Sequence, residues 1–349
     1  MTMYVPYSDD LEVEQPDEQA QIADIVRDLG IAHERMIEAR AQAPRGTQAK
    51  GHGVLKGVFT VAPDLPGELA QSLFATPGEY PAILRFATEP GAFMDDRRPA
   101  ARGLAMKLMG VDGEKMVGDG RVTQDFLFGN CPVLPLADVT TYREIARLRA
   151  EYGHDPEQLA AEIAKRDDGD VQTLFERLPN IDLLANSYYS QSAFRFGDYV
   201  CKYALMPNID AQRALAARPV TDDDGPDVLA EWLAAFLADN AAGFDFCVQL
   251  MTDPKAMPIE DASIEWDVGR SAWRRVGTLH LPPQDPGTPA RQTFGDEVLT
   301  FDPWAGRPDL RPLGSINRAR KAVYRASARR REINGRAELE PASFADCPD

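Results

Sequence analysis

The chain has 349 residues, of which 44% are hydrophobic and 27% are charged. This ordinary globular composition excludes a fibre or a disordered chain, and the length suits about two domains or one large β-rich domain with added helices. The 55 acidic and 38 basic side chains give a net charge of −17. Such a field repels the phosphates of nucleic acids and anionic lipid headgroups, so we expect no nucleic-acid partner and no membrane partner.

The N-terminal residues and the scattered cysteines point to a cytoplasmic protein without a metal cluster of its own. Residues 1–20 carry six acidic side chains, where a signal peptide has a basic start and an apolar middle. No segment approaches the roughly 18 consecutive apolar residues of a membrane helix. The four cysteines and four histidines lie far apart along the chain, which fits neither a disulfide framework nor a zinc site.

From the N-terminus onward, the hydrophobic pattern predicts one helix and then a set of strands. Residues 17–43 repeat apolar side chains with a helical period and predict a peripheral helix. From Gly53 on, short apolar runs broken by glycine and proline are typical of an antiparallel sheet. The predicted strands cover residues 54–61, 82–86, 103–109, 125–128, 199–206, 244–250, 275–281 and 298–301.

Helical patterns lie between and after these strands, at residues 137–178, 227–240 and 315–331. The combination predicts an α+β fold, most simply a closed antiparallel β-barrel with external helices. We expect an acidic segment and helix at residues 1–44, and a barrel domain at residues 45–349 with inserted helices at about 137–178 and 209–240. The basic side chains at 325 and 329–331 are expected to form a solvated face of the last helix.

The last predicted helix carries the most informative pair of side chains. Arg320 and Tyr324 are four residues apart, so the guanidinium can reach the phenol oxygen. A neighbouring cation together with a ferric centre holds a phenol as phenolate, and tyrosine is a known ligand of haem iron. The same spacing is also common where a cation lies over an aromatic ring. The chain contains no Gly-rich phosphate-binding motif and no G-x-S-x-G motif.

Several segments, in order, resemble motifs of the haem catalase family. The segment FDP at residues 301–303, followed by Arg320 and Tyr324, is similar to the family's proximal haem motif. The similar upstream segments are RGTQAKGHG at 45–53, PAILRFA at 81–87, ARGLAMK at 101–107, DFLFGNCP at 125–132, and residues 264–279. The resemblance covers residues 45–142 and 260–330. Without the family's long N-terminal arm or a flavodoxin-like domain, the chain resembles the small catalase-related subclass.

The resemblance implies a haem b site and assigns the side chains that hold the cofactor. Tyr324 would be the axial iron ligand, and Arg320 the cation that keeps it ionised. Arg45 and Arg85 would pair with the haem propionates, since bidentate contacts between guanidinium and carboxylate groups are favourable. Their alternative role is an ordinary salt bridge at a strand end. Thr47 would lie at the cofactor as part of the distal segment.

Two further residues are assigned by the same resemblance. Asn130 would be the distal amide that hydrogen-bonds bound peroxide, although the register leaves Gly129 as an alternative match. Asn130 could instead form a turn before Cys131 and Pro132. Tyr142 would place its ring against the porphyrin, or could be an apolar helix residue of the core.

The sequence departs from the family at the distal pair. The position of the catalytic histidine is Gln48, and the serine that would orient that imidazole is Ala87. A carboxamide forms hydrogen bonds but cannot move a proton between the two oxygens of a peroxide. His52 faces the same side of an extended strand about 13 Å away, and reaches the iron only if the strand bulges. It could equally be an ordinary strand histidine.

These features predict a haem b protein with peroxidase or lipid-hydroperoxide-transforming activity, and without fast catalase turnover. Its substrate would be a peroxide or an organic hydroperoxide, and the resemblance implies a homo-oligomer. An alternative is a non-catalytic haem-binding or sensing protein that keeps the barrel but has lost the distal machinery. A third is a haem-free relative of the barrel.

Overall fold

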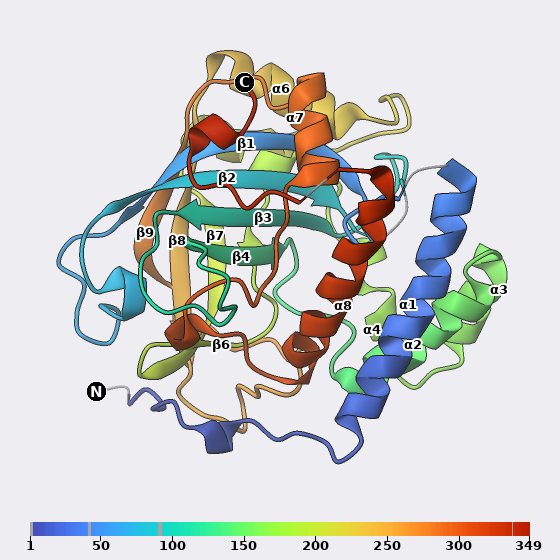
Figure 1. Ribbon diagram of the computed structural model, residues 1–349, viewed down its shortest axis with the longest axis horizontal. Helices are drawn as coiled ribbons and strands as arrows, with labels where there is room; N and C mark the ends of the chain where they lie inside the picture. Colours follow the sequence, from blue (N-terminus) through green and yellow to red (C-terminus); the bar gives the residue numbers. More distant parts are fainter. Residues whose placement is uncertain (1–2, 41–42, 90–92, 337) are drawn as a thin grey trace.

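The computed structural model describes residues 3–40, 43–89, 93–336 and 338–349, and its centre is a closed β-barrel (Figure 1). Its strands are β1 (Lys50–Val61), β2 (Glu79–Thr88), β3 (Arg102–Met109), β4 (Thr123–Gly129), β5 (Tyr188–Tyr189), β6 (Phe194–Phe196), β7 (Tyr199–Pro207), β8 (Ala242–Leu250) and β9 (Arg274–Leu281). The order around the sheet is β5-β4-β3-β2-β1-β9-β8-β7-β6, and β5 also pairs with β7. That extra pairing closes eight antiparallel strands into a ring, and β6 extends β7 as a hairpin.

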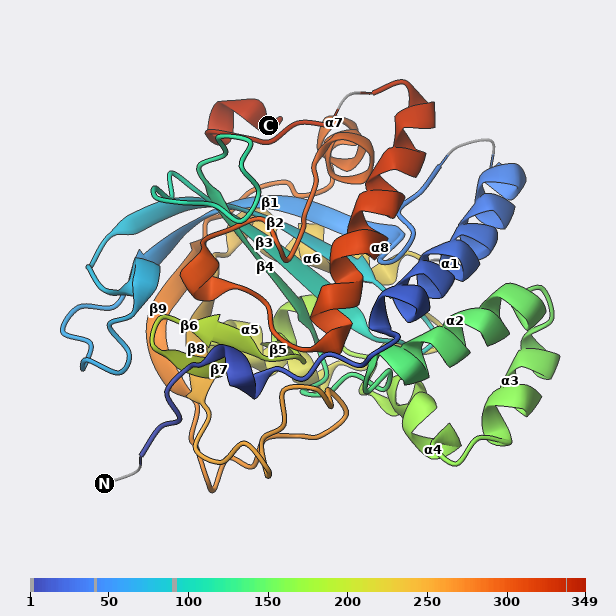
Figure 2. The same ribbon diagram turned by 60° about the horizontal axis from the view of Figure 1, so that its bottom comes forward.

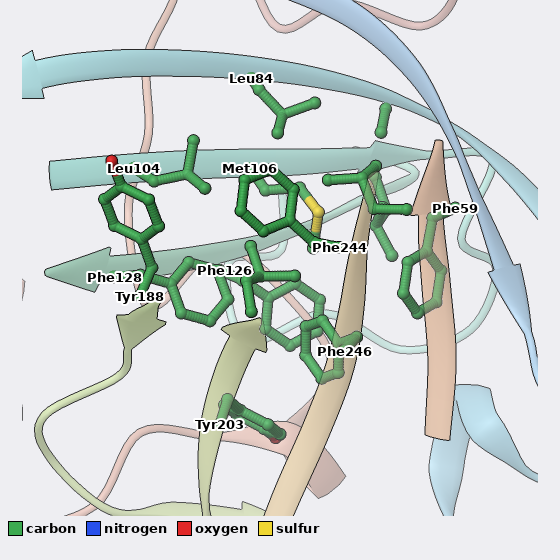
Figure 3. Packing of buried hydrophobic residues seen from close by; sticks show 14 of the residues in the cluster. Phe59, Leu84, Leu104, Met106, Phe126, Phe128, Tyr188, Tyr203, Phe244 and Phe246 are labelled. Atoms are coloured by element: carbon green, nitrogen blue, oxygen red, sulfur yellow. The ribbon is translucent and has the colours of Figure 1, made fainter. Parts of the chain in front are cut away.

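The interior of the barrel is filled by aromatic and aliphatic side chains (Figure 3). Alternate residues of a strand face opposite sides of the sheet, and Leu104, Met106 and Phe126 belong to this interior cluster. The ring of Phe246 lies 5.1 Å from that of Phe126 and 5.5 Å from that of Tyr203, measured between ring centroids. The barrel lumen is therefore the hydrophobic core of the molecule.

The helices lie outside the barrel (Figure 2). They are α1 (Glu18–Arg40), α2 (Val139–Tyr152), α3 (Pro156–Ala164), α4 (Gly169–Gln172), α5 (Asp210–Ala214), α6 (Val228–Asp239), α7 (Pro289–Thr293) and α8 (Ser315–Arg331). Helix α1 packs against both α2 and α8, which gather on one side of the barrel. None of the helices within the described residues is long and apolar enough to cross a membrane.

The predicted fold class, an antiparallel barrel with external helices, is confirmed, but two predicted elements differ from the structure and two short strands were not predicted. The predicted strand at 298–301 is wrong: Phe294–Val298 forms a π-helical turn, and Leu299 makes only an isolated bridge to Leu339. Its apolar side chains are buried in a loop. The predicted helical region at 137–178 is broken where Asp155 caps a new helix that starts at Pro156. The short strands β5 and β6 carry too few residues to show a period of two, and the sequence analysis did not predict them.

Candidate functional site

Two adjoining cavities lie between α8 and the outer face of the barrel near β1 to β4. The outer cavity has a volume of about 240 Å³ and the inner cavity about 110 Å³. Because both are lined by the same central side chains, they are two ends of one slot. The shared side chains are Thr47, Gln48, Arg85, Ala105, Leu127, Val323 and Tyr324. The outer cavity is also lined by His33, Arg45, Asp302, Arg331 and Glu338, and the inner cavity by Ala87, Glu89, Tyr142, Gln191 and Arg320, among others.

One wall of the slot is formed by α8, which carries the predicted Arg320 and Tyr324 pair. The Arg320 guanidinium donates a hydrogen bond to the Tyr324 phenol oxygen at 2.9 Å. The same guanidinium donates to the Asn317 side-chain oxygen at 3.2 Å, and the Ser192 hydroxyl donates to that oxygen as well. Asn317 is fully buried, and its amide donates to the carbonyl of Ala193 on the barrel side. This chain of bonds fixes the guanidinium that faces the phenol.

A partly buried ion-pair network holds the first turn of α8 in place. The Arg318 guanidinium donates to Glu18 of α1 at 2.6 Å, to Glu12 at 2.8 Å and to Glu260 at 2.9 Å. Three carboxylates from separate segments therefore converge on one cation, so the position of α8 is tied to α1 and to the loop before β9. Side chains that α8 presents to the slot are held with it.

The outer cavity gathers three buried guanidinium groups. Arg45, Arg85 and Arg331 line it, and their exposed fractions are 9%, 4% and 4%. Arg85 pairs with Asp296 at 2.7 Å and Arg331 with Glu338 at 3.2 Å. Burial, reinforced by the other two arginines, lowers the pKa of Arg45. Because Arg85 and Arg331 already have acidic partners and Arg45 makes no ion pair within the described residues, an anionic group at this end of the slot would be favoured.

Two of these guanidinium groups have donors without partners. The Nε atoms of Arg45 and Arg331 are buried and make no hydrogen bond within the described residues. Arg331 was expected on a solvated helix face, and that expectation is wrong because α8 turns this residue toward the cavity. The helical spacing contains the signal: Arg331 lies seven residues after Tyr324, which is close to two full turns and therefore the same face.

The wall opposite α8 carries two glutamines that rest on glycines. Gln48 has a left-handed backbone, with φ 56°, and its carboxamide lies so close to Gly103 that a Cβ there would overlap it. Gln191, with φ 64°, lies in the same way over Gly129. The Gln48 side-chain oxygen is buried and has no hydrogen-bond partner within the described residues. Sequence analysis missed Gln191, because nothing in its local pattern indicates this conformation.

His52 lies outside both cavities. Strand β1 bulges between Gly51 and Gly53, so His52 is an extra residue relative to β2. The bulge turns the imidazole to the Thr88 hydroxyl, at 2.7 Å from Nε2, with the Asp96 carboxylate 4.0 Å from Nδ1. Burial and neighbouring cations lower the pKa of His52 well below its usual value. The strand therefore does bulge, but the ring enters a buried polar cluster instead of the slot.

The remaining predicted residues divide between the slot and its surroundings. Tyr142 is buried on α2 and lines the inner cavity, and Thr47 lines both cavities. Asn130 is not among the lining residues. Its side-chain oxygen accepts from the backbone N–H of Arg102 at 2.8 Å, and its amide donates to Asn186 at 3.2 Å. Both ends of the Asn130 carboxamide are thus engaged within the protein.

The lining suits a largely apolar molecule with an anionic group at its outer end. The walls offer Leu127, Val323 and other aliphatic side chains, the outer end offers cations, and one wall presents a phenol paired with a guanidinium. A phenol oxygen that accepts a hydrogen bond from a guanidinium group can act as a ligand to a metal ion carried by an organic cofactor.

Comparison with known proteins relates the chain to catalases. The chain is 26% identical over 309 residues to the catalase-related peroxidase of Mycolicibacterium paratuberculosis (strain ATCC BAA-968 / K-10). This match covers 82% of the chain and 88% of that protein. No family model matches the chain.

Solved catalase structures share the fold. The TM-score is 0.59 for catalase A from Saccharomyces cerevisiae, 0.53 for a fungal catalase and 0.54 for a bacterial catalase. Each is 17% identical and matches 85% of this chain. The matches cover 63%, 61% and 60% of those proteins, so the chain spans about three fifths of their length.

Proposed function

Since the chain is a catalase-like protein in fold and in its match to a catalase-related peroxidase, we propose that it binds haem b in the slot and reacts with hydrogen peroxide or an organic hydroperoxide. The reaction would be of the peroxidase or hydroperoxide-transforming type. Fast catalase turnover is not proposed, because the distal position carries the carboxamide of Gln48.

The residues present fit the cofactor. Haem b is flat and apolar and has two propionates, which match the aliphatic walls and the cations of Arg45, Arg85 and Arg331. The unpartnered Nε donors of Arg45 and Arg331 would gain acceptors from these carboxylates. Tyr324 would hold the iron through its phenol oxygen, to which the Arg320 guanidinium donates a hydrogen bond.

Haem b, when bound, supplies an iron centre that exchanges electrons with a peroxide. The chain's own groups would bind and orient the substrate on the opposite wall. Gln48 and Thr47 offer hydrogen bonds there, and the Tyr142 ring offers an apolar surface for the porphyrin. We propose supporting roles for His52 and Asn130, since both are bonded within the protein outside the slot.

The observation that carries the proposal is the Arg320 hydrogen bond to Tyr324 on one wall of a slot whose outer end holds three buried arginines. The test is reconstitution with haem, followed by absorption spectroscopy. We expect the wild type to bind one haem with a Soret band of a tyrosinate-ligated ferric protein. Tyr324→Phe is expected to bind haem at least about tenfold more weakly and to lose that spectrum.

Tyr152→Phe is the matched control, because this tyrosine lies at the end of α2 away from both cavities. It is expected to give the wild-type spectrum. A wild type without a Soret band, or a Tyr324→Phe spectrum identical to that of the wild type, would contradict the proposal.

One observation favours a second candidate, a haem-binding or sensing role without turnover. Within the described residues that line the inner cavity, no imidazole is present, and Gln48 and Gln191 are both carboxamides. To separate the two roles, turnover of hydrogen peroxide and cumene hydroperoxide is measured with a phenolic reductant for the wild type, His52→Ala and Gln48→Ala. Turnover that is lost in either variant supports the enzyme, and no turnover in any sample supports the binding role.

A further inference from the structure

Glu89 is a carboxylate in the inner cavity that the proposed function does not use. It directly follows β2, and its backbone N–H donates to the Ala101 carbonyl at 2.9 Å, so the ladder with β3 continues through it. Residues two apart on a strand face the same side. Glu89 therefore shares its face with Arg85 and Ala87, which also line the inner cavity.

Strand register sets Glu89 beside the distal carboxamide. Strands β1 and β2 pair Lys50 with Thr88. Glu89 directly follows this last pair on one strand, and Ala49 and Gln48 directly precede it on the other, so both segments leave the sheet at the same edge. The carboxylate and the carboxamide consequently belong to the same end of the slot, and both line the inner cavity.

The carboxylate of Glu89 is available for chemistry. The side chain is partly buried, and among the described residues it makes no hydrogen bond and no ion pair. Burial raises the pKa of the Glu89 carboxyl, while Arg149 of α2 and Arg320 of α8 act in the opposite direction. A carboxyl group whose pKa is raised can both accept and return a proton.

We propose that Glu89 transfers the proton between the two oxygens of a hydroperoxide bound in the inner cavity, the task that Gln48 cannot perform. This inference rests on the proposed function. Glu89 would be the proton carrier of that same site. It directly follows β2, which pairs with β1, and Gln48 lies just before β1.

The proton balance is simple. The Glu89 carboxylate takes the hydrogen of the terminal O–H group and returns it to the other peroxide oxygen. The O–O bond breaks with its electron pair on that second oxygen, which leaves as water or an alcohol, and Glu89 ends as it began. Over a full cycle, a phenolic hydrogen donor supplies two electrons and two protons, and the remaining oxygen leaves as water.

The other polar groups of the inner cavity are less suited to this task. Gln48 and Gln191 are carboxamides, which do not titrate. Burial raises the pKa of the Tyr142 phenol, which keeps it neutral. Ser190 and Ser192 donate their hydroxyls within the chain, to the carbonyl of Ser192 and to the Asn317 side chain.

Cyanide binding tests the proposal without turnover. Hydrogen cyanide must lose its proton to bind ferric haem, and a base in the cavity accepts that proton, whereas nitric oxide has no proton to lose. In the haem-loaded protein, Glu89→Gln is expected to slow cyanide association about 10²-fold and to leave nitric oxide association unchanged. Glu89→Asp, which keeps a carboxylate, is expected to recover part of the rate. Glu79→Gln, at the exposed other end of β2, is the control and should match the wild type.

The wild type alone provides a second measurement, in case Glu89→Gln does not fold. Its cyanide association rate is expected to fall as the pH is lowered and Glu89 becomes protonated, and the fall should begin at a higher pH than for an exposed glutamate, because burial raises the pKa of Glu89. A rate without that dependence, or an unchanged rate in Glu89→Gln, overturns the role of Glu89. A wild type with no Soret band overturns the proposed function instead, and with it the inference, so the two failures are distinguishable.

Discussion

His52 shows how one inserted residue changes the role of a side chain. Within β1 it is the extra residue of a bulge, fully enclosed beside Thr88 and Asp96. Burial is the main cause that lowers its pKa, and the cations of Arg102 and Lys50 add to the effect. In the folded state the imidazole is therefore neutral under conditions in which the unfolded chain binds a proton.

We expect this residue to make the fold sensitive to mild acid. As pH falls below about 6.5, the unfolded state takes up a proton that folded His52 does not, so the free energy of unfolding falls by up to ~1.4 kcal/mol per pH unit. His52→Gln removes that one-proton slope, measured by urea unfolding at several pH values. His154→Gln removes an exposed imidazole and should keep the wild-type slope. An unchanged slope in His52→Gln would show that His52 is protonated in the folded state.

At the scale of elements, a buried ion pair ties β3 and β4 to the segment that leads into α8. The side chains of Lys107 and Asp125 are fully buried, with Nζ 2.6 Å from the Asp125 carboxylate and 2.8 Å from that of Glu340. The other oxygen of Asp125 accepts from the backbone N–H of Asp302, which lines the outer cavity. Breaking such a pair leaves a buried charge without a partner.

Lys107→Met is expected to lower the free energy of unfolding by roughly 3–5 kcal/mol, measured by urea denaturation, because it leaves two carboxylates facing each other. Adding Asp125→Asn should restore part of the loss, since one of the two charges is removed. Arg147→Met breaks an exposed pair with Glu151 of 2.9 Å and should cost less than about 1 kcal/mol. Equal costs at the two sites would contradict the importance of burial here.

Local patterns predicted what depends on local spacing. The four-residue step from Arg320 to Tyr324 is a property of any helix, and the guanidinium does reach the phenol oxygen. Arg331 follows the same helical geometry, which places it on the face of Tyr324, although its charge predicts exposure. The short apolar runs broken by glycine and proline likewise located most strands, because both are local features of the sequence.

Features set by distant contacts were not predictable in this way. The bulge at His52 occurs where Gly53 lies so close to Pro286 that a Cβ would be 2.8 Å from it. Residues 298–301 are apolar because they are buried against Phe294 and Phe344 in the fold, not because they pair as a strand. Such packing depends on segments that are far apart along the chain.

For the molecule as a whole, stability and function occupy different layers. The barrel lumen is packed with rings: Phe246 contacts Phe59 and Phe126 (Figure 3). It also contacts Phe74. The slot lies on the outside of that barrel, against α8. A ligand that binds only the folded state stabilises it by an amount set by its affinity and concentration. Changes in the lumen and in the slot should therefore affect unfolding in different ways.

Phe246→Leu leaves space in the lumen and is expected to lower the free energy of unfolding by about 1–3 kcal/mol, below the ~3–5 kcal/mol typical of Phe→Ala. Phe246 does not itself line the slot and reaches it only through the ring of Phe128, so the loss should be similar with and without haem. Arg85→Leu should instead reduce the stabilisation that haem gives, by at least ~1.4 kcal/mol for a tenfold loss of affinity. Thermal and urea unfolding of each variant, with and without haem, measure both effects. If Phe246→Leu weakened haem binding as strongly as Arg85→Leu, packing in the lumen would control binding in the slot, which would contradict the prediction.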